Sequence, residues 1–369
     1  MLRPAPSRAG SRLRILPRAL LRQIGGRAQP TGEPQRILVA HHLLAGDVLM
    51  LTPLLAKLRE RHPAAEIVMT VCARLLPLYA GRPYGVRATV FDPRNASTLE
   101  AVFAGGGYDL AFVPGDNRFS WLAAAAGSRW IVAFDGDRPA YKSWPVDEFR
   151  RYPASSAAWG DMVAALVPGE PPSRFRASDW PLPGCRPFER PQGRTAVLHV
   201  EASTPLKHWE DAKWLELADR LAAAGLDVVW SAGPQGEALL GRIDAAGRYP
   251  ALGHLLDLAQ LWNLVNEAAL LVCPDTSVMH IGRLAGTPTV ALFGPSSAPL
   301  FGPGEFLRDI PYRALTVEDF PFRDQNHLFK REIAWIRRCQ RSTAECPSPR
   351  CVHAIGFAEV AHHAIEIAR

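Results

Sequence analysis

Asp275-Thr276-Ser277-Val278-Met279-His280 separates two short apolar runs in this chain. The runs, 268–273 and 289–293, each predict a buried parallel strand, and 278–284 between them predicts a helix. A carboxylate and two hydroxyl groups therefore lie at the carboxyl end of a strand and at a helix N-terminus, where open α/β sheets bind ligands. Free backbone N–H groups and the helix dipole at such a point favour a phosphate group.

The same alternation of strand and helix extends in both directions and predicts two Rossmann-like domains with parallel sheets. In the first half we expect strands at 36–40, 66–71, 110–113 and 130–134, and helices at 47–62 and 121–126. The second half predicts strands at 195–200 and 227–231, helices at 209–224, 234–245 and 258–266, and a last helix at 357–367. A run rich in proline and glycine, 181–194, predicts the linker between the halves.

Positive charge is concentrated at the N-terminus. The net charge is +6, and residues 1–32 hold seven arginines and no acid, which leaves 35 basic and 36 acidic residues in the rest of the chain. A nearly neutral body argues against a nucleic-acid-binding surface. The arginines are interleaved with leucine and isoleucine, so three interpretations stay open: a flexible solvated arm, an amphipathic element on anionic lipid, or an organellar transit peptide.

Sorting signals and cysteines suggest where the protein works. We find neither the continuous apolar core of a secretory signal nor a run of about 20 apolar residues that would span a membrane. We therefore expect a cytoplasmic protein, with a peripheral position at the inner face of the cytoplasmic membrane as the alternative. Cys72 and Cys273 lie in apolar runs typical of core residues. Cys339, Cys346 and Cys351 favour structural thiols with at most one disulfide, although zinc binding together with His353 and a redox function stay open.

Three blocks of the sequence, in one order, resemble glycosyltransferase family 9, the lipopolysaccharide heptosyltransferase family. The first block is Gly46-Asp47-Val48-Leu49 with Thr52-Pro53-Leu54-Leu55 and Leu58, and the second is Ser203-Thr204 with Lys207-His208-Trp209 and Ser231-Ala232-Gly233-Pro234. The third is Asp275-Thr276 with His280 and the run from Thr287 to Pro295. Together they cover roughly residues 36–300, and the closing cysteine-rich stretch and final helix also look like the family's C-terminal end.

The resemblance implies a fold and a domain plan. It implies an α/β protein of the GT-B class, in which two Rossmann-like domains face an interdomain cleft. We expect a flexible basic arm over 1–33, an acceptor-binding domain over 34–180, the linker over 181–194, and a nucleotide-sugar-binding domain over 195–350. Residues 351–369 are expected to form a helix that packs back on the body.

The resemblance also implies a reaction. It implies the transfer, with inversion, of a sugar from a nucleotide-diphosphate sugar to a lipid-linked saccharide, with heptose from ADP-heptose and a lipopolysaccharide-core acceptor as the expected pair. No G-x-G-x-x-G follows a strand and no P-loop pattern occurs, so neither a dinucleotide cofactor nor a P-loop is predicted. No metal is required by this interpretation, and no nucleic acid partner is expected.

Two residues are the candidate catalytic groups. Asp47 matches the carboxylate that the family uses as general base, and sugar transfer needs a base for the acceptor proton. Its alternative role is to cap the helix that begins there. Lys207 matches the family lysine on the diphosphate, where a positive charge stabilises the leaving group; its alternative role is that of a solvated loop lysine.

The candidate donor-binding residues cluster in the second half of the chain. They are Ser203, Thr204, Glu237, Asp275, Thr276, Ser277 and His280. The hydroxyl groups would donate to the diphosphate, Asp275 would orient N–H groups or bind a sugar hydroxyl, and Glu237 matches the family glutamate on the ribose. A buried helix histidine is the alternative for His280, and a surface helix acid is the alternative for Glu237. Trp209 favours a packing role.

The chain departs from the family pattern at several points. Val200-Glu201 replaces the usual Pro-Gly, Ser277 replaces the usual glycine after Asp-Thr, and 41–45 lacks the basic residue common there. Asp135-Gly136-Asp137 resembles the metal-binding D-x-D of another glycosyltransferase fold, but we interpret it as a turn. Two functions stay open beside transfer: a GT-B protein that binds nucleotide sugars without turnover, and a nucleotide-sugar epimerase.

Overall fold

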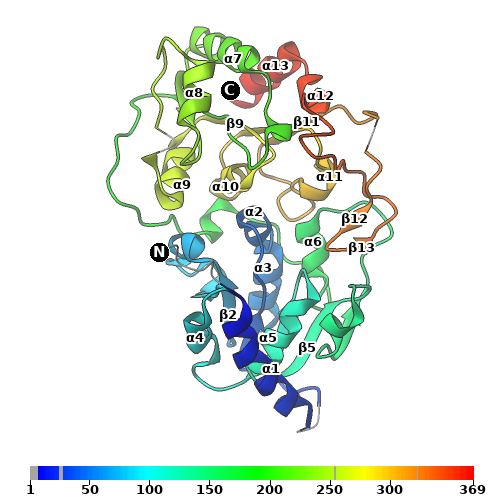
Figure 1. Ribbon diagram of the computed structural model, residues 1–369. Helices are drawn as coiled ribbons and strands as arrows, with labels where there is room; N and C mark the ends of the chain where they lie inside the picture. The colour runs from blue at the N-terminus through cyan, green and yellow to red at the C-terminus, as the bar shows by residue number, and fades with distance from the viewer. Residues whose placement is uncertain (1–6, 25–27, 253–254, 322) are drawn as a thin grey trace, which may run out of the picture. The chain divides into compact units, whose positions relative to one another are not determined.

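A computed structural model describes residues 7–24, 28–252, 255–321 and 323–369 of the chain. These residues form two compact units, whose elements are labelled in Figure 1. Unit 1 runs to Ser155 and also contains Gly160–Ser173 and His327–Ala334. Unit 2 contains Ser156–Trp159, Arg174–Asn326 and Trp335–Arg369. Each unit has its own sheet and its own core.

The sheet of unit 1 is parallel throughout, in the order β3-β2-β1-β4-β5-β6. This is the dinucleotide-fold order, in which the chain reverses direction across the sheet between β1 and β4. The strands are β1 (Arg36–Val39), β2 (Glu66–Val71), β3 (Val86–Val90), β4 (Tyr108–Val113), β5 (Ser128–Phe134) and β6 (Glu148–Arg150). β1, β4 and β5 read as apolar runs because helices cover both faces of such a sheet.

Short helices surround this sheet. The α-helices are α1 (Ala9–Ile24), α2 (Ala45–Leu49), α3 (Thr52–Arg61), α4 (Leu99–Phe103), α5 (Ser120–Ala125) and α6 (Trp159–Ala164), the last entering unit 1 at Gly160. The 3-10 helical segments are η1 (Ala73–Tyr79), η2 (Pro83–Gly85), η3 (Ala96–Thr98), η4 (Asn117–Phe119) and η5 (Ala140–Ser143). A small antiparallel hairpin, β12 (His327–Leu328) with β13 (Arg331–Glu332), completes the unit.

Unit 2 has a second parallel sheet with a different order, β11-β10-β9-β7-β8. Numbered from its own first strand, this is the 2-1-3-4-5 order, whose direction reverses between the first and third strands. The strands are β7 (Thr195–His199), β8 (Asp227–Ser231), β9 (Leu270–Pro274), β10 (Thr289–Phe293) and β11 (Tyr312–Thr316). The helical segments are η6 (Ala177–Asp179), η7 (Pro205–Lys207), α7 (Asp211–Ala223), α8 (Glu237–Ile243), α9 (Leu258–Glu267), α10 (Ser277–Ala285), α11 (Ala298–Phe301), α12 (Arg350–His353) and α13 (Phe357–Ile367). Residues 181–194 have no regular secondary structure.

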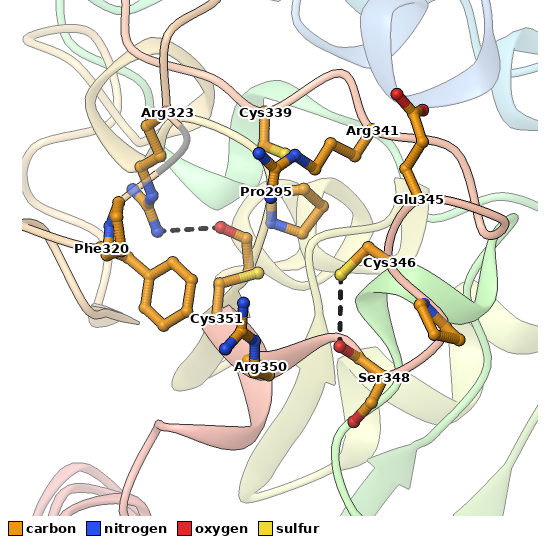
Figure 2. A pocket seen from close by; sticks show the side chains of 13 residues that line it. Pro295, Phe320, Arg323, Cys339, Arg341, Glu345, Cys346, Ser348, Arg350 and Cys351 are labelled. Carbon is orange, nitrogen blue, oxygen red and sulfur yellow. Dashed lines mark hydrogen bonds between the residues drawn. The ribbon is translucent and has the colours of Figure 1, made fainter.

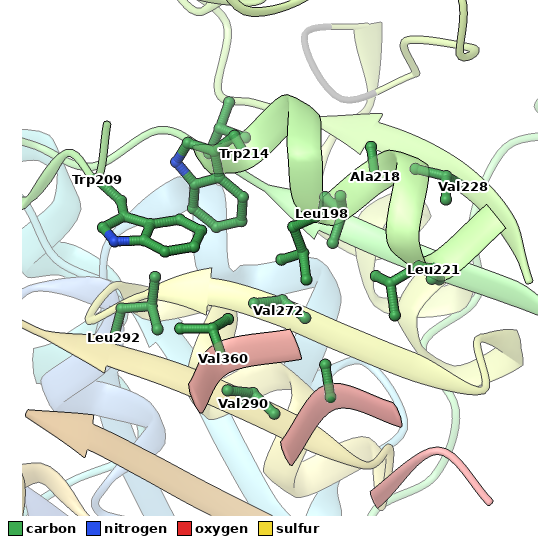
Figure 3. Close-up of a cluster of buried hydrophobic side chains, with 14 of the residues drawn as sticks. Leu198, Trp209, Trp214, Ala218, Leu221, Val228, Val272, Val290, Leu292 and Val360 are labelled. Atoms are coloured by element: carbon green, nitrogen blue, oxygen red, sulfur yellow. The ribbon is translucent and has the colours of Figure 1, made fainter. Parts of the chain in front are cut away.

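One continuous core holds unit 2 together. Figure 3 shows side chains of α7, α13 and the strands of the sheet meeting in it, among them Trp214, Leu221, Val272, Val290 and Val360. The final helix therefore packs on the same face of the sheet as α7. Burying aliphatic and aromatic side chains of this size stabilises a domain by about 1.5–3 kcal/mol each, so the last residues of the chain are part of the fold of unit 2.

Close packing of α10 depends on glycine. A Cβ on Gly282 would lie 2.5 Å from Thr289 Oγ1 and 2.6 Å from Leu271 Cδ2, so only a glycine lets the helix approach β9 and β10 this closely. Gly286 ends the helix in the left-handed conformation, at φ 76°, which a residue without Cβ adopts without strain. These two positions place the N-terminus of α10 directly after β9.

The predicted helix over 47–62 is wrong as a single element. The structure has α2 and α3 instead, separated at Met50 and Leu51. Pro53 lies in the first turn of α3, the place that tolerates its missing N–H and avoids a clash with the carbonyl four residues earlier. The Thr52 hydroxyl donates to Leu49 O at 2.6 Å. This hydrogen bond gives a partner to a carbonyl oxygen at the end of α2, where the helix is interrupted.

The flexible arm predicted over 1–33 is wrong for residues 9–24. Ala9–Ile24 forms α1, which packs against α5 of unit 1 and buries Ala19. The remaining positions 1–6 and 25–27 lie outside the described residues. Among the helices that the structure describes, none is both long enough and apolar enough to cross a bilayer.

The expected domain boundaries also differ from the two units. Residues 327–334, expected in the second domain, belong to unit 1 because Arg331 is buried there. Its guanidinium donates to Gly115 O at 3.0 Å, Asp135 O at 2.7 Å and Asn117 Oδ1 at 2.7 Å. Residues 174–180, expected in the first domain, belong to unit 2.

Asp135-Gly136-Asp137 lies directly after β5, outside regular secondary structure, and its two carboxylates have different surroundings. Asp137 is buried, accepts from Lys142 Nζ at 2.9 Å and from Asn117 N at 2.8 Å, and lies 3.7 Å from Arg331. Asp135 is exposed and accepts only locally, from Gly136 N at 2.6 Å. Asp137 thus neutralises two buried cations.

We expect Asp137→Asn to lower the free energy of unfolding by about 3 kcal/mol, because it removes the carboxylate beside buried Arg331 and leaves Lys142 with Asp116 alone. Urea unfolding of both variants gives the comparison. Asp135→Asn, the matched control two residues away, should change the free energy by less than about 0.5 kcal/mol. Equal effects of the two substitutions would contradict the structural role given to Asp137.

Candidate functional site

The candidate site of unit 2 lies where its sheet reverses direction. β7 and β9 are neighbours there although they are not consecutive in sequence. The loops that follow such a pair diverge to opposite faces and leave room for a ligand. Lys207 follows β7 at the end of η7, and Asp275 follows β9 directly. The fold thus brings together two of the predicted site residues, which are 68 positions apart.

Lys207 and Asp275 form a partly buried ion pair. Lys207 Nζ donates to Asp275 Oδ2 at 2.7 Å and to the carbonyl oxygen of the same residue at 2.9 Å. The Asp275 side chain is 7% exposed, whereas that of Lys207 is 22% exposed. An ammonium group has three N–H donors, so one remains for a ligand on the open side.

A third loop is joined to this pair. Ser296 follows β10, is buried, and its Oγ donates to Asp275 Oδ2. The backbone N–H of Asp275 donates to Leu292 O at 3.0 Å, which ties β9 to β10. Ser296 was not among the predicted site residues. The signal that could have identified it is a hydroxyl residue just after a buried strand that neighbours β9.

The N-terminus of α10 adjoins the ion pair. Thr276 is its N-cap, and the Thr276 side chain accepts from Val278 N at 3.2 Å. Ser277 is the first helical residue and is half-buried. The N–H groups of the first turn have no partner inside a helix and carry the positive end of its dipole. Together with Lys207 they make this point attractive to an anion.

His280 is buried on the first turns of α10 and is neutral. Burial, with the nearby positive charges of Arg283 and Lys207, lowers its pKa well below the usual value. Its Nδ1 accepts from the Arg283 guanidinium, which leaves Nε2 as the protonated nitrogen. His280 can therefore offer a ligand an N–H donor but no positive charge.

The other predicted donor residues surround this centre unevenly. Thr204 caps η7 with its side chain, which accepts from Leu206 N at 3.4 Å, and Ser203 beside it is exposed. Glu237 is exposed at the start of α8, after β8. Glu201, noted above only as a departure from the family pattern, accepts from Gly233 N at 2.6 Å and so links the loops after β7 and β8.

Asp47 belongs to unit 1 and holds an equivalent position in that sheet. It follows β1, the strand that borders the reversal point with β4. It is the third residue of α2 and is half-buried. The N-cap of α2 is Leu44, whose side chain makes no capping bond, so Asp47 is not the N-cap of this helix.

A cavity lies beside the Lys207 site within unit 2. Its volume is about 280 Å³, and it begins at Gly294 and Pro295, directly before Ser296. Figure 2 shows that the cysteine-rich segment supplies much of its wall, with Cys339, Cys346 and Cys351. Arg323 crosses to the strand end and donates to Gly294 O at 2.8 Å.

The cysteines are free thiols. None of the six is in a disulfide, and burial raises the pKa of the Cys351 thiol, so this group is protonated at neutral pH. Within the described ranges, the one set of side chains with metal-ligand spacing is His362, His363 and Glu366 on α13, not the cysteine cluster with His353. The structure thus favours thiols that line a cavity wall.

Comparison with known proteins gives a consistent result. The sequence profile of glycosyltransferase family 9 (heptosyltransferase) matches residues 181–310. The chain is 28% identical to lipopolysaccharide heptosyltransferase 1 of Pseudomonas aeruginosa over 208 residues, which are 53% of this chain and 57% of that protein. The chain thus spans little more than half the length of this relative. It is 23% identical to lipopolysaccharide heptosyltransferase 3 of Escherichia coli over 310 residues, 76% of this chain and 89% of that protein.

The fold comparison extends over nearly the whole chain. The structure of ADP-heptose lps heptosyltransferase II from Escherichia coli superposes with a TM-score of 0.67 at 18% identity, covering 90% of this chain and 98% of that one. Two parallel sheets with helices on both faces and this likeness show the GT-B fold class that the sequence predicts.

Buried histidines make the stability of unit 2 depend on pH. Burial lowers the pKa of His199 to about 4, and that of His280 is also lowered. An unfolded histidine has a pKa near 6.5, so below that pH the unfolded state binds protons that the folded state does not. Stability is therefore present above about pH 6.5 and is lost as the pH falls toward 4, by up to about 1.4 kcal/mol per pH unit for each histidine.

We expect His199→Gln to reduce this loss by about 2 kcal/mol between pH 6.5 and 4.5. Urea unfolding at a series of pH values, followed by tryptophan fluorescence, measures it. The exposed His362 provides the control, and His362→Gln should leave the pH dependence as in the unchanged chain. A pH dependence that is the same with and without His199 would contradict the assignment.

Proposed function

We propose that this chain, which belongs to glycosyltransferase family 9, transfers a glycosyl group with inversion from a nucleotide-diphosphate sugar to a saccharide acceptor. The single observation that supports this most is the anion site of unit 2. An ammonium with one unused donor, the first turn of α10 and a neutral histidine converge there. This combination suits a diphosphate leaving group, whose negative charge grows as the glycosidic bond breaks.

In the proposed reaction the donor belongs to unit 2. Lys207 and the N–H groups at Thr276 and Ser277 would hold the diphosphate, and Asp275 with Ser296 would position the lysine. The Lys207 side chain is already fixed by two hydrogen bonds, so it loses little conformational entropy when the ligand binds. Glu237, at the start of α8 after β8, and the hydroxyl groups of Ser203 and Thr204 complete the proposed donor set.

Asp47 of unit 1 is the proposed general base. The acceptor hydroxyl oxygen forms the new bond to the anomeric carbon while its proton passes to the Asp47 carboxylate. The bond from that carbon to the diphosphate oxygen breaks on the opposite face, and the diphosphate leaves with the electron pair. Attack opposite the leaving group inverts the configuration, as in other single-displacement glycosyl chemistry.

The proposed substrates follow the named relatives. Their names describe lipopolysaccharide heptosyltransferases, one of them with ADP-heptose. We propose heptose from ADP-heptose as the transferred group and a lipopolysaccharide-core or related saccharide as the acceptor. Neither the proposed base nor the proposed donor contacts call for a bound metal ion.

Substitution of the proposed base tests the reaction. We expect Asp47→Asn to lower the transfer rate by at least about 100-fold, because an amide cannot accept the proton, while ADP binding by calorimetry stays within about three-fold. Transfer is measured by mass spectrometry of a deacylated core saccharide incubated with ADP-heptose. Asp135→Asn is the matched control and should leave the rate unchanged.

The result also separates transfer from binding alone. Transfer at a near-normal rate by Asp47→Asn would remove Asp47 as the base. Binding of ADP-sugars by the unchanged chain with no product on any saccharide acceptor would replace the transferase proposal with a non-catalytic nucleotide-sugar-binding protein. Conversion of the donor sugar in the absence of acceptor would instead indicate an epimerase.

The role of Lys207 can be separated from its effect on folding. Lys207→Met leaves the Asp275 carboxylate buried without its partner, so we expect lower stability together with ADP binding weaker by about ten-fold or more. In Lys207→Met with Asp275→Asn, the uncompensated charge is gone, and the free energy of unfolding should recover while ADP binding stays weak. Recovery of ADP affinity in the double variant would show that the lysine acts only on the fold.

A further inference from the structure

The first helix of the chain packs on α5 of unit 1 through one face, and Arg14 and Arg18 beside that face also contact unit 1. Ser11, Ile15 and Ala19, four residues apart, face α5 and its surroundings, and Ser11 and Ala19 are buried. Near its end, Arg22 donates to Asp147 Oδ2 at 2.7 Å and to Arg129 O at 2.8 Å. α1 is thus anchored to unit 1 along its length. These contacts fix its orientation and therefore determine which side of the helix faces away from α5.

The opposite side of α1 is apolar and open to solvent. Leu13, Leu16 and Leu20 have the spacing i, i+3, i+7, which places them in one stripe. At about 100° per residue this stripe lies roughly opposite the Ser11, Ile15 and Ala19 face. Leu13 is 74% exposed and Leu20 51% exposed. Half or more of the surface of Leu13 and Leu20 is therefore open to solvent and is not covered by unit 1.

Arginines border this stripe on both sides. Arg12 lies between the stripe and the packed face on one side, and Arg14 and Arg18 lie between them on the other. Arg14 forms an exposed ion pair with Glu100 at 3.3 Å, and Arg18 lies over the Phe103 ring at 4.5 Å. The sequence of α1 contains no acidic residue. An apolar stripe between basic borders is the pattern of a helix that lies in the plane of an anionic membrane surface.

Two exposed aromatic residues lie in the segment that Arg22, near the C-terminal end of α1, contacts. Trp144 is 64% exposed, and Tyr141 is also exposed. Both are tied to α5, since Trp121 Nε1 donates to Tyr141 O at 2.9 Å and the Trp121 and Trp144 rings are 6.4 Å apart. Arg22 connects this corner to α1 through Pro145 O. Tryptophan and tyrosine are the side chains that favour the level of the lipid headgroups.

We propose that the outer face of α1, with Tyr141 and Trp144, docks unit 1 on an anionic lipid bilayer. The leucines enter the boundary between headgroups and acyl chains, and the bordering arginines contact lipid phosphates. The charge selects this occupant, because basic residues on both sides of the stripe complement anionic headgroups. The proposal goes beyond the transfer reaction and does not depend on it, since lipid binding needs neither Asp47 nor Lys207.

Vesicle co-sedimentation of the full chain tests the docking surface. We expect binding to vesicles of phosphatidylcholine with about one third phosphatidylglycerol, and weak binding to phosphatidylcholine alone. Binding to the mixed vesicles should fall when salt is raised, because salt screens the arginines. Leu13→Gln with Leu20→Gln should weaken binding by about ten-fold or more.

A matched control separates this face from exposed leucines in general. Leu182 is 51% exposed and Leu255 is 70% exposed, and both lie in unit 2. Leu182→Gln with Leu255→Gln should bind vesicles as the unchanged chain does. Arg12→Gln should weaken binding to the mixed vesicles by about five-fold and leave binding to phosphatidylcholine alone as it was. Thermal unfolding of each variant checks that unit 1 remains folded.

Three outcomes would overturn the proposal. The first is failure of the unchanged chain to bind the mixed vesicles. The second is binding that survives Leu13→Gln with Leu20→Gln in a folded protein. The third is a concentration-dependent dimer that these two substitutions abolish while vesicle binding persists, because a second copy of the chain would then be the occupant. A variant that loses vesicle binding but still transfers sugar to a soluble acceptor at the normal rate supports the docking surface. That result does not contradict the proposed transfer reaction.

Discussion

The contact between Lys207 Nζ and the Asp275 carboxylate organises the candidate site of unit 2. Asp275 is almost fully buried, and a carboxylate in such a place requires a counter-charge. Lys207 supplies it, and Ser296 adds a hydrogen bond to the same oxygen. The loops after β7, β9 and β10 are therefore held by one charged group. The stability and the proposed chemistry of this site therefore depend on the same three side chains.

The same physical rule places the candidate residues in both units, although the two sheets have different strand orders. In unit 1 the reversal lies between β1 and β4, and Asp47 follows β1. In unit 2 it lies between β7 and β9, and Lys207 and Asp275 follow these strands. Loops diverge at a reversal point because successive crossovers pass on opposite faces of the sheet. Polar side chains can gather there without disturbing the packed layers below.

The end of the chain contributes more than a terminal helix. α13 fills the core of unit 2 beside α7, while the cysteine-rich segment before it lines a cavity next to Ser296. Residues 327–334 leave unit 2 and bury Arg331 in unit 1, where six acceptors or partners surround its guanidinium. A buried guanidinium is stable only when its donors are satisfied in this way. The hydrogen bonds and ion pair of Arg331 therefore hold this segment to unit 1, although its sequence neighbours belong to unit 2.

The sequence by itself determined the buried strands and the polar residues that follow them, because apolar runs bounded by turn residues carry a strong local signal. β1, β2, β8 and β10 and the N-terminus of α10 follow from it, as do the positions of Asp47, Lys207 and Asp275 along the chain. The break between α2 and α3 was not predicted, although Pro53 in the sequence indicates that a helix begins there. Only the tertiary structure decided that Lys207 meets Asp275 and that Ser296 joins them. It also decided that His280 is neutral. The membership of Arg331 in unit 1 and the packing of α1 by one face were likewise decided only by the tertiary structure. Each of these depends on residues distant in sequence, on burial or on charge compensation, and no local pattern encodes which distant partner a side chain will meet.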